Sequence, residues 1–267
     1  TYEYVEKDED GTVTLREVRD YIAIATTRPE TMLGDGAVAV HPDDARYAPI
    51  VGKRCEIPVG PKDKRRLIPI ITDEYPDMAF GSGAVKITGA HDFNDYQVAK
   101  RGGIPLYRLM NTVAAMRDDG LSYADSAAKA QAILDGAQFS EAEVDQINLV
   151  PDEYRGLDRF EARTKIVEAI TSEGLAVMVP NPEAAKADAD GGDGEAVPDQ
   201  VRDVPSHIPL VENKSIMKPY GDRSGVVIEP MLTDQWFVDA ARLAGPAMEA
   251  VRSGETQILP ERDAKVY

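Results

Sequence analysis

The sequence predicts an α+β fold, in which a mostly β, barrel-like domain with short peripheral helices is followed by a helical C-terminal segment. Three observations predict this class. Short apolar runs of β character recur through residues 1–110 and are separated by glycine and proline. Apolar residues recur at helical spacing in the middle third of the chain. The 267 residues are also enough to bury a substantial core without disulfides or metals.

The N-terminal elements are expected to be short strands. Residues 1–25 fit two strands joined by a turn at Asp10-Gly11, a dipeptide typical of tight hairpins. Residues 21–25 and 37–40 are short apolar runs that fit buried strands. Further strands are predicted at residues 67–71, 84–88 and 106–109. The prolines among these runs favour edge strands and tight corners.

Helices are expected from residue 95 onward. The segment 95–101 fits a short helix that ends at Gly102-Gly103. Ser140 with Glu143 fits a capping box at the start of another helix. The remaining predicted helices cover residues 124–134, residues 157–170 with a stop at Gly174, and residues 239–252 with an interruption at Pro246.

The pattern divides the chain into one domain over residues 1–230 and a separate segment over residues 231–267. Residues 181–205 lack a hydrophobic pattern, and six acidic residues and one lysine lie between Glu183 and Asp199. We therefore expect a flexible acidic insertion there. The chain does not begin with methionine and ends abruptly at Tyr267, so we interpret it as a piece of a longer protein.

Charge and cysteine content narrow the possible functions. The net charge is −17, which excludes a protein that wraps nucleic acid with an overall basic surface. Cys55 is the single cysteine, so no disulfide and no cysteine-based zinc site can form, and a reducing cytoplasm is the expected compartment. No apolar run reaches the roughly 18 residues that a membrane span needs, so we expect no membrane association.

The first polar segment that could carry chemistry follows the strand predicted at residues 21–25. It contains Thr26, Thr27, Arg28 and Thr31. Their hydroxyl and guanidinium groups suit a ligand with ribose hydroxyls, carbonyls or phosphate. The alternative is a turn whose threonines cap a helix that begins at Pro29.

Two further polar segments follow later in the chain. Lys86 and Thr88 share one face of a predicted strand, and they either converge on a ligand or form a solvated surface. His91, Asp92 and Asp95 lie in a loop that enters a helix. One carboxylate could anchor an ammonium group while the other orients a water. The alternative role for such residues at this place is helix capping.

The same residues could also suggest a metal site. His41 with Asp43 and Asp44, together with His91 and Asp92, supplies possible ligands, but the histidines are not at helical ligand spacing. We predict no metal. The chain also lacks a Gly-x-Ser-x-Gly elbow and a phosphate-binding loop of the Gly-x-x-x-x-Gly-Lys-Ser/Thr type, which argues against a serine triad and a nucleotide triphosphatase.

Taken together, these segments resemble the editing domain of the large class I aminoacyl-tRNA synthetases. Residues 25–35, Ala-Thr-Thr-Arg-Pro-Glu-Thr-Met-Leu-Gly-Asp, resemble the threonine-rich editing loop, and residues 81–96 resemble the second editing motif. Residues 37–44 and the Lys-Ile-Thr at 86–88 match the valyl members, as do residues 221–225 and 229–238 on the path back to the catalytic core. Gly36 and Gly89 depart from the usual threonine and proline, which changes backbone freedom near the site.

The resemblance implies hydrolysis of threonine mischarged onto tRNA(Val), with a positioned water as the nucleophile. Lys86, Thr88 and Asp92 would surround the threonine side chain, and Asp95 would pair with its α-ammonium. The residues expected to shape the pocket and hold the 3′-terminal adenosine are Thr26, Thr27, Arg28, Thr31 and His91.

The resemblance also implies partners and cofactors. The partners would be the 3′ end of tRNA(Val) and the remainder of the parent synthetase, and the chain itself would be monomeric. His-Ile-Gly-His and Lys-Met-Ser-Lys-Ser motifs do not occur in the chain, so it should not activate valine. We therefore expect no cofactor here, with ATP and Mg²⁺ used by the catalytic part of the parent. The alternatives are a non-catalytic docking module for the tRNA CCA end and a metal-dependent hydrolase that uses His41, His91 and the nearby aspartates.

Overall fold

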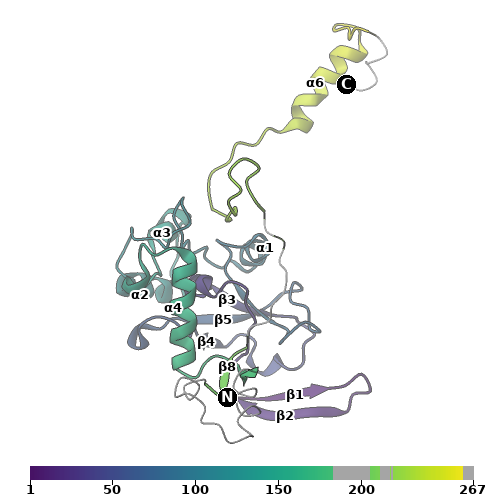
Figure 1. The fold of residues 1–267 in the computed structure, drawn as a ribbon. Coiled ribbons are helices and arrows are strands. Elements are labelled where there is room, and N and C mark those ends of the chain that lie inside the picture. Colours follow the sequence, from purple (N-terminus) through teal and green to yellow (C-terminus); the bar gives the residue numbers. More distant parts are fainter. Residues whose placement is uncertain (183–204, 211–216, 218, 261–267) are drawn as a thin grey trace, which may run out of the picture. The chain divides into compact units, whose positions relative to one another are not determined.

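A computed structural model describes residues 1–182, 205–210, 217 and 219–260. The chain forms two compact units, Thr1–Met231 and Leu232–Tyr267. Helices and strands share the first unit, so the predicted α+β class is confirmed (Figure 1). The acidic stretch at 183–199 lies outside the described residues.

The main sheet has four strands in the order β4-β5-β3-β6. These are β4 (Arg54–Glu56), β5 (Leu67–Thr72), β3 (Ala37–Val40) and β6 (Ala84–Ile87). β3 is parallel to β5 and antiparallel to β6, and β4 is antiparallel to β5.

The expected barrel-like closure is not found among the described strands, because β4 and β6 remain the two open edges of this sheet. A loop and α1 (Phe93–Gly102) follow β6 where a closing strand would be needed. The description "mostly β" is also wrong for the described residues of the first unit, where the α-helices contain more residues than the strands.

β3 is buried on both faces and separates two apolar clusters. Val38 and Val40 belong to the larger cluster, whereas Ala37 and Ala39 belong to a smaller one. The split follows from the alternation of side chains along a strand. Alanines on the second face leave room for α1, which packs against β6 and contributes Val98 to the smaller cluster.

The predicted N-terminal hairpin is confirmed. β1 (Tyr2–Lys7) and β2 (Val13–Arg19) pair antiparallel, and Gly11 supplies the left-handed turn conformation with φ of +80°. The strand predicted at 21–25 does not form. There the Tyr21 carbonyl accepts a hydrogen bond from the Tyr2 hydroxyl, and the Tyr21 side chain is exposed.

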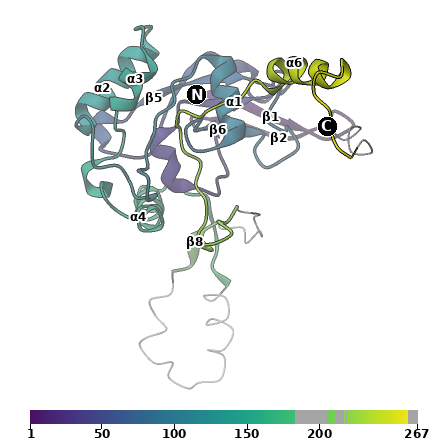
Figure 2. The same ribbon diagram turned by 90° about the horizontal axis from the view of Figure 1, so that it is seen from above.

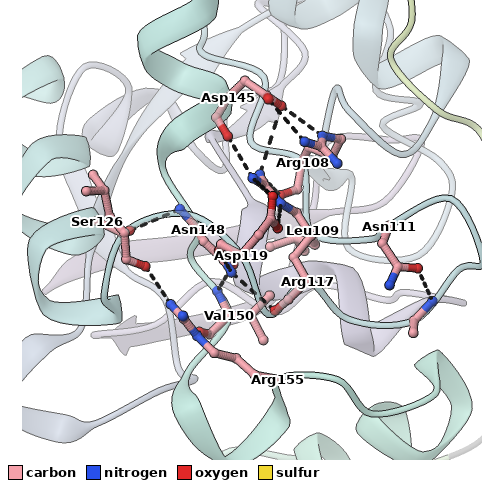
Figure 3. A network of polar contacts seen from close by, with 12 residues as sticks. Arg108, Leu109, Asn111, Arg117, Asp119, Ser126, Asp145, Asn148, Val150 and Arg155 are labelled. Atoms are coloured by element: carbon pink, nitrogen blue, oxygen red, sulfur yellow. Dashed lines mark hydrogen bonds and ion pairs between the residues drawn. The ribbon is translucent and has the colours of Figure 1, made fainter.

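The strand predicted at 106–109 is also wrong, because Leu109 bonds outside a sheet. Its N–H donates to the His91 imidazole at 2.8 Å, and its carbonyl accepts from the Arg117 N–H at 2.8 Å. Arg117 is buried and sits in a polar network with Asp119, Asn148 and the loop that carries Leu109 (Figure 3). The backbone of the segment 106–109 therefore holds the loop of His91 in place.

The predicted helices form with small shifts in their ends. α2 (Tyr123–Leu134), α3 (Glu141–Gln146) and α4 (Arg159–Ser172) belong to the first unit, and α2 and α3 lie side by side (Figures 1 and 2). The capping box of Ser140 and Glu143 is present at the start of α3.

The last helix is α6 (Ala240–Arg252), which continues through Pro246 without the predicted interruption. A proline removes a single intrahelical hydrogen bond, and here the turns on both sides form. β7 (Met178–Pro180) and β8 (His207–Pro209) pair antiparallel. Among the residues that the structure describes, every helix is too short or too polar to cross a membrane.

Gly36 and Gly89 are explained by close packing and not by an unusual backbone. Neither residue has positive φ. A Cβ at position 36 would lie 2.4 Å from Cγ2 of Ile104, and one at position 89 would lie 2.6 Å from Cδ2 of Leu106. The loop after α1 therefore fills the space that larger residues would need.

We expect Gly36→Thr to lower the free energy of unfolding by about 1–3 kcal/mol, because the new side chain overlaps Ile104. Adding Ile104→Ala should recover part of that loss. The measurement is urea denaturation of both single variants and the double variant. Strictly additive effects would contradict the packing explanation, since two residues in contact should couple.

Candidate functional site

A buried polar cluster lies where β6 meets the loop before β3. The Lys86 ammonium donates to Oγ1 of Thr31 at 3.0 Å and to Oγ1 of Thr88 at 2.6 Å. Asp35 accepts a hydrogen bond from the Thr88 hydroxyl, and its carboxylate lies 3.5 Å from Lys86 Nζ. All four side chains are buried. We call Thr31, Asp35, Lys86 and Thr88 the lysine cluster.

Local sequence places each member of the lysine cluster. Lys86 lies on β6 and Thr88 directly after it, two positions apart and therefore on one side of the chain. Thr31 and Asp35 lie in and just after a 3-10 helix, η1 (Pro29–Gly34). Pro29 opens η1, as the helix-start alternative predicts, but Arg28 at its N-cap makes no side-chain capping bond. The solvated-strand alternative for Lys86 is wrong.

Asp95 lies against the lysine cluster. It is buried near the start of α1, and its Oδ2 accepts a hydrogen bond from the Thr88 N–H at 2.9 Å. Burial raises the pKa of the Asp95 carboxyl to about 6, against the opposing effects of that hydrogen bond and of Lys86. Burial also raises the pKa of Asp35, although the Lys86 ammonium acts in the opposite direction.

Asp92 takes the capping role that the sequence left open. Its Oδ1 accepts from the N–H groups of Asn94 and Asp95, at 2.8 Å and 3.1 Å, and so caps α1. The Asp92 side chain is exposed. The start of α1 thus has one carboxylate, Asp92, that caps the helix and another, Asp95, that is buried beside Lys86.

His91 is buried and neutral. Its Nε2 accepts from the Leu109 N–H at 2.8 Å, so the ring proton is on Nδ1, a buried atom without a protein hydrogen-bond partner in the described part of the chain. Burial, together with Arg28, Lys86 and Arg108, lowers the pKa of His91 to about 3. The imidazole can therefore donate one hydrogen bond but does not carry positive charge at neutral pH.

Arg28 holds the threonine-rich loop to its surroundings. Its Nη1 donates to the His91 carbonyl at 2.8 Å, and its Nη2 lies 2.5 Å from a carboxylate oxygen of Glu229. Thr31 Oγ1 donates to the Arg28 carbonyl at 2.9 Å. Thr26 accepts from the Arg28 N–H at 3.0 Å, and Thr27 is exposed.

The structure therefore brings Thr31, Lys86, Thr88 and Asp95 together and leaves Thr26, Thr27 and Asp92 outside the lysine cluster. Three acidic residues that sequence reasoning missed complete the surroundings. They are Asp35, Glu229 and Glu30, which is fully buried and paired with Arg163 of α4 at 2.7 and 2.8 Å. All three lie within the segments 25–35 and 229–238 that resemble the synthetases, but only their contacts and burial in the structure distinguish them from their neighbours.

The other candidate sites are separate from the lysine cluster. Within the described ranges, no group of three or more histidine, cysteine, aspartate or glutamate side chains is arranged to hold a metal. His41 Nδ1 accepts from the Asp43 N–H at 3.2 Å. Two surface hollows, one lined by Val59 and Tyr154 and the other by Ala124 and Gln131, contain none of the predicted site residues.

Comparison with known proteins finds similarity to one class of protein, the aminoacyl-tRNA synthetases, although no family model matches the chain. Over its whole length the chain is 66% identical to valine–tRNA ligase of Ruegeria pomeroyi, 40% to that of Xanthomonas campestris and 42% to that of Caulobacter vibrioides. The chain is thus homologous to one segment of valine–tRNA ligases, as its motifs predicted. It spans 26%, 21% and 22% of the lengths of these relatives.

Proposed function

We propose that this chain is the editing part of a valine–tRNA ligase and hydrolyses threonine mischarged onto tRNA(Val). The observation that carries the proposal is the lysine cluster beside Asp95. Threonine and valine have the same shape and differ by one hydroxyl in place of one methyl. A cluster of buried donors and acceptors favours the hydroxyl, because valine would leave those groups unpaired.

The free-energy cost of leaving these buried groups unpaired is large enough for an editing step that selects threonine over valine. An unpaired buried polar group costs about 1–3 kcal/mol. Each group that the threonine hydroxyl satisfies therefore contributes roughly 5- to 150-fold in preference over valine. Two such groups, for example Lys86 and Thr88, are enough to separate the two esters strongly.

Asp95 is the proposed partner of the substrate α-ammonium. Its carboxylate is buried, is held in place by the Thr88 N–H, and lies next to the lysine cluster. An ammonium bound there would have its side chain directed to Lys86 and Thr88. Asp92 uses Oδ1 to cap α1, so its Oδ2 can still contact the substrate at the pocket rim.

The remaining residues are proposed to position the ester and the terminal adenosine. Arg28 and Thr31 form the wall of the pocket, and Thr26 and Thr27 offer hydroxyls toward the ribose. The Nδ1–H of His91 is a donor without a protein partner in the described part of the chain, and it suits an oxygen of the bound ester or ribose.

The reaction is hydrolysis by a positioned water. The water oxygen forms a bond to the ester carbonyl carbon, and the bond between that carbon and the ribose oxygen then breaks. The ribose oxygen takes a proton, and threonine leaves as a carboxylate with release of one proton. The neighbouring ribose hydroxyl assists this transfer, while binding and orientation by the protein supply most of the rate.

The proposed partner is the 3′ end of tRNA(Val). Because the chain carries a net charge of −17, we propose that only this end enters the domain and that other parts of the ligase hold the rest of the tRNA. We further propose that the chain works as a monomer in the cytoplasm, and that valine activation with ATP and Mg²⁺ occurs elsewhere in the ligase.

Threonyl-tRNA(Val) deacylation by the ligase that contains this chain tests the proposal. We expect hydrolysis of threonyl-tRNA(Val) at least about 25-fold faster than that of valyl-tRNA(Val), since each of two unpaired groups contributes at least about fivefold. If the ligase binds the tRNA but accelerates the hydrolysis of neither ester, the result favours the non-catalytic docking module. Loss of activity in chelator with recovery on metal addition would favour the metal-dependent hydrolase.

A further inference from the structure

Asp35 is a buried carboxylate that the proposed reaction does not use. It follows η1 and is only 4% exposed, yet it faces Lys86 and Thr88 at the centre of the site. A buried carboxylate is costly unless it is paired and hydrogen-bonded. Asp35 is both, and its partners are the two residues expected to read the substrate side chain.

The hydrogen-bond directions within the lysine cluster are determined. An ammonium can only donate, so the Thr88 and Thr31 oxygens accept from Lys86. Each threonine hydroxyl has one hydrogen of its own. Thr88 donates it to the Asp35 carboxylate, and Thr31 donates it to the Arg28 carbonyl. Both hydroxyl hydrogens are therefore committed inside the protein.

These hydrogen-bond directions determine which donor and acceptor positions of the lysine cluster remain for a ligand. A hydroxyl oxygen has two lone pairs, and Lys86 occupies one on each threonine. Thr88 therefore has an acceptor position left but no hydrogen to donate. Two of the three N–H groups of Lys86 are directed to the threonines, and the Asp35 carboxylate lies 3.5 Å from the same nitrogen, within reach of the third.

We propose that Asp35 is a positioning residue whose carboxylate accepts the hydrogen bond from the Thr88 hydroxyl. The Thr88 oxygen can then only accept a hydrogen bond from the substrate, so the site selects side chains that donate one. This inference rests on the proposed editing function and adds the direction of the bond. The substrate class is an aminoacyl ester with a hydroxyl on its β-carbon. A group of the same size that cannot donate is rejected.

The first test changes the substrate and leaves the protein intact. Three esters of tRNA(Val) are compared with the wild-type ligase, carrying threonine, valine, or the threonine analogue in which fluorine replaces the hydroxyl. Fluorine is close to a hydroxyl in size and cannot donate a hydrogen bond. We expect the fluoro ester to be hydrolysed within about threefold of the valyl ester and at least about eightfold more slowly than the threonyl ester.

Different results of this test would contradict the proposed editing function and the proposed role of Asp35. If the fluoro ester is hydrolysed as fast as the threonyl ester, the site does not require a donor and the role of Asp35 is overturned, while editing stands. If the threonyl ester is not hydrolysed faster than the valyl ester, the proposed function itself is overturned, and with it the role of Asp35.

The second test changes Asp35. Asp35→Leu keeps roughly the size of the side chain but has no atom that accepts a hydrogen bond, so the Thr88 hydroxyl hydrogen is released. We expect at least a tenfold drop in the ratio of kcat/KM for the threonyl ester to that for the valyl ester. A merely structural role would lower both rates equally and leave the ratio as in the wild type, which would overturn the proposal.

A matched control comes from the other end of β3. Asp73 is also a largely buried carboxylate, it accepts two hydrogen bonds from Arg101, and its N–H donates to the Val40 carbonyl. Asp73→Leu should leave the ratio unchanged. If Asp35→Leu does not fold, the fluoro ester with the wild-type protein still decides between the outcomes.

Discussion

Arg163→Met is expected to lower the free energy of unfolding by about 3 kcal/mol. The change leaves the carboxylate of Glu30 without its main partner, and Glu30 is fully buried. Removing one member of a buried ion pair costs about 3–5 kcal/mol because the other charge remains desolvated. We expect the lower end of that range, since Arg163 is 26% exposed and Arg28 lies 3.4 Å from Glu30.

The same helix supplies a matched control for this prediction. Lys165 also lies in α4 and pairs with Glu161, but both side chains are about half exposed. Lys165→Met should change the free energy of unfolding by less than about 0.5 kcal/mol. Urea denaturation measures both variants. The explanation also requires that Glu30→Gln in the Arg163→Met background recover much of the loss, and a further loss would contradict it.

Asp95→Asn is expected to lower kcat/KM for threonyl-tRNA(Val) by at least about 100-fold, which corresponds to about 2.7 kcal/mol. The amide is neutral, so it cannot balance the α-ammonium in a buried site. The variant should still fold, because an amide oxygen can accept the hydrogen bond from the Thr88 N–H. Deacylation assays on the purified ligase measure the effect.

The pH dependence provides an independent check on Asp95. Burial raises the pKa of this carboxyl to about 6, and the ionised form is the one that binds an ammonium. We therefore expect kcat/KM, corrected for hydrolysis without protein, to rise about tenfold per pH unit below pH 6 and to level off above it. Asp95→Asn should lose this rising limb, and an unchanged limb would assign the titration to another group.

The stability of Asp95→Asn separates loss of charge from loss of fold. The pKa of Asp95 in the folded protein lies above its ordinary value, so the folded state binds the proton more tightly than the unfolded state does. The ionised carboxylate thus lowers stability as pH rises from about 4 to about 6, and this cost persists at pH 7. At pH 7 the asparagine variant should be at least as stable as the wild type.

Local signals account for the elements that the sequence predicted well. Asp10-Gly11 favours a tight turn by itself, and Ser140 with Glu143 forms its capping box within one helical turn. The predictions that failed concern strands that need a partner. Residues 21–25 and 106–109 have β-like composition, but their backbone groups bond to Tyr2, His91 and Arg117 instead of to a neighbouring strand.

The sequence by itself determined the homology to valine–tRNA ligases and the motifs that contain the candidate residues, because these are properties of residue order. Only the tertiary structure decided which of those residues meet. Thr88 contacts Asp35 across 53 positions, and Arg163 contacts Glu30 across 133. Residue spacing along a strand or helix cannot encode such pairs. Burial then gives these contacts their energy, since it removes the water that would otherwise satisfy each charge.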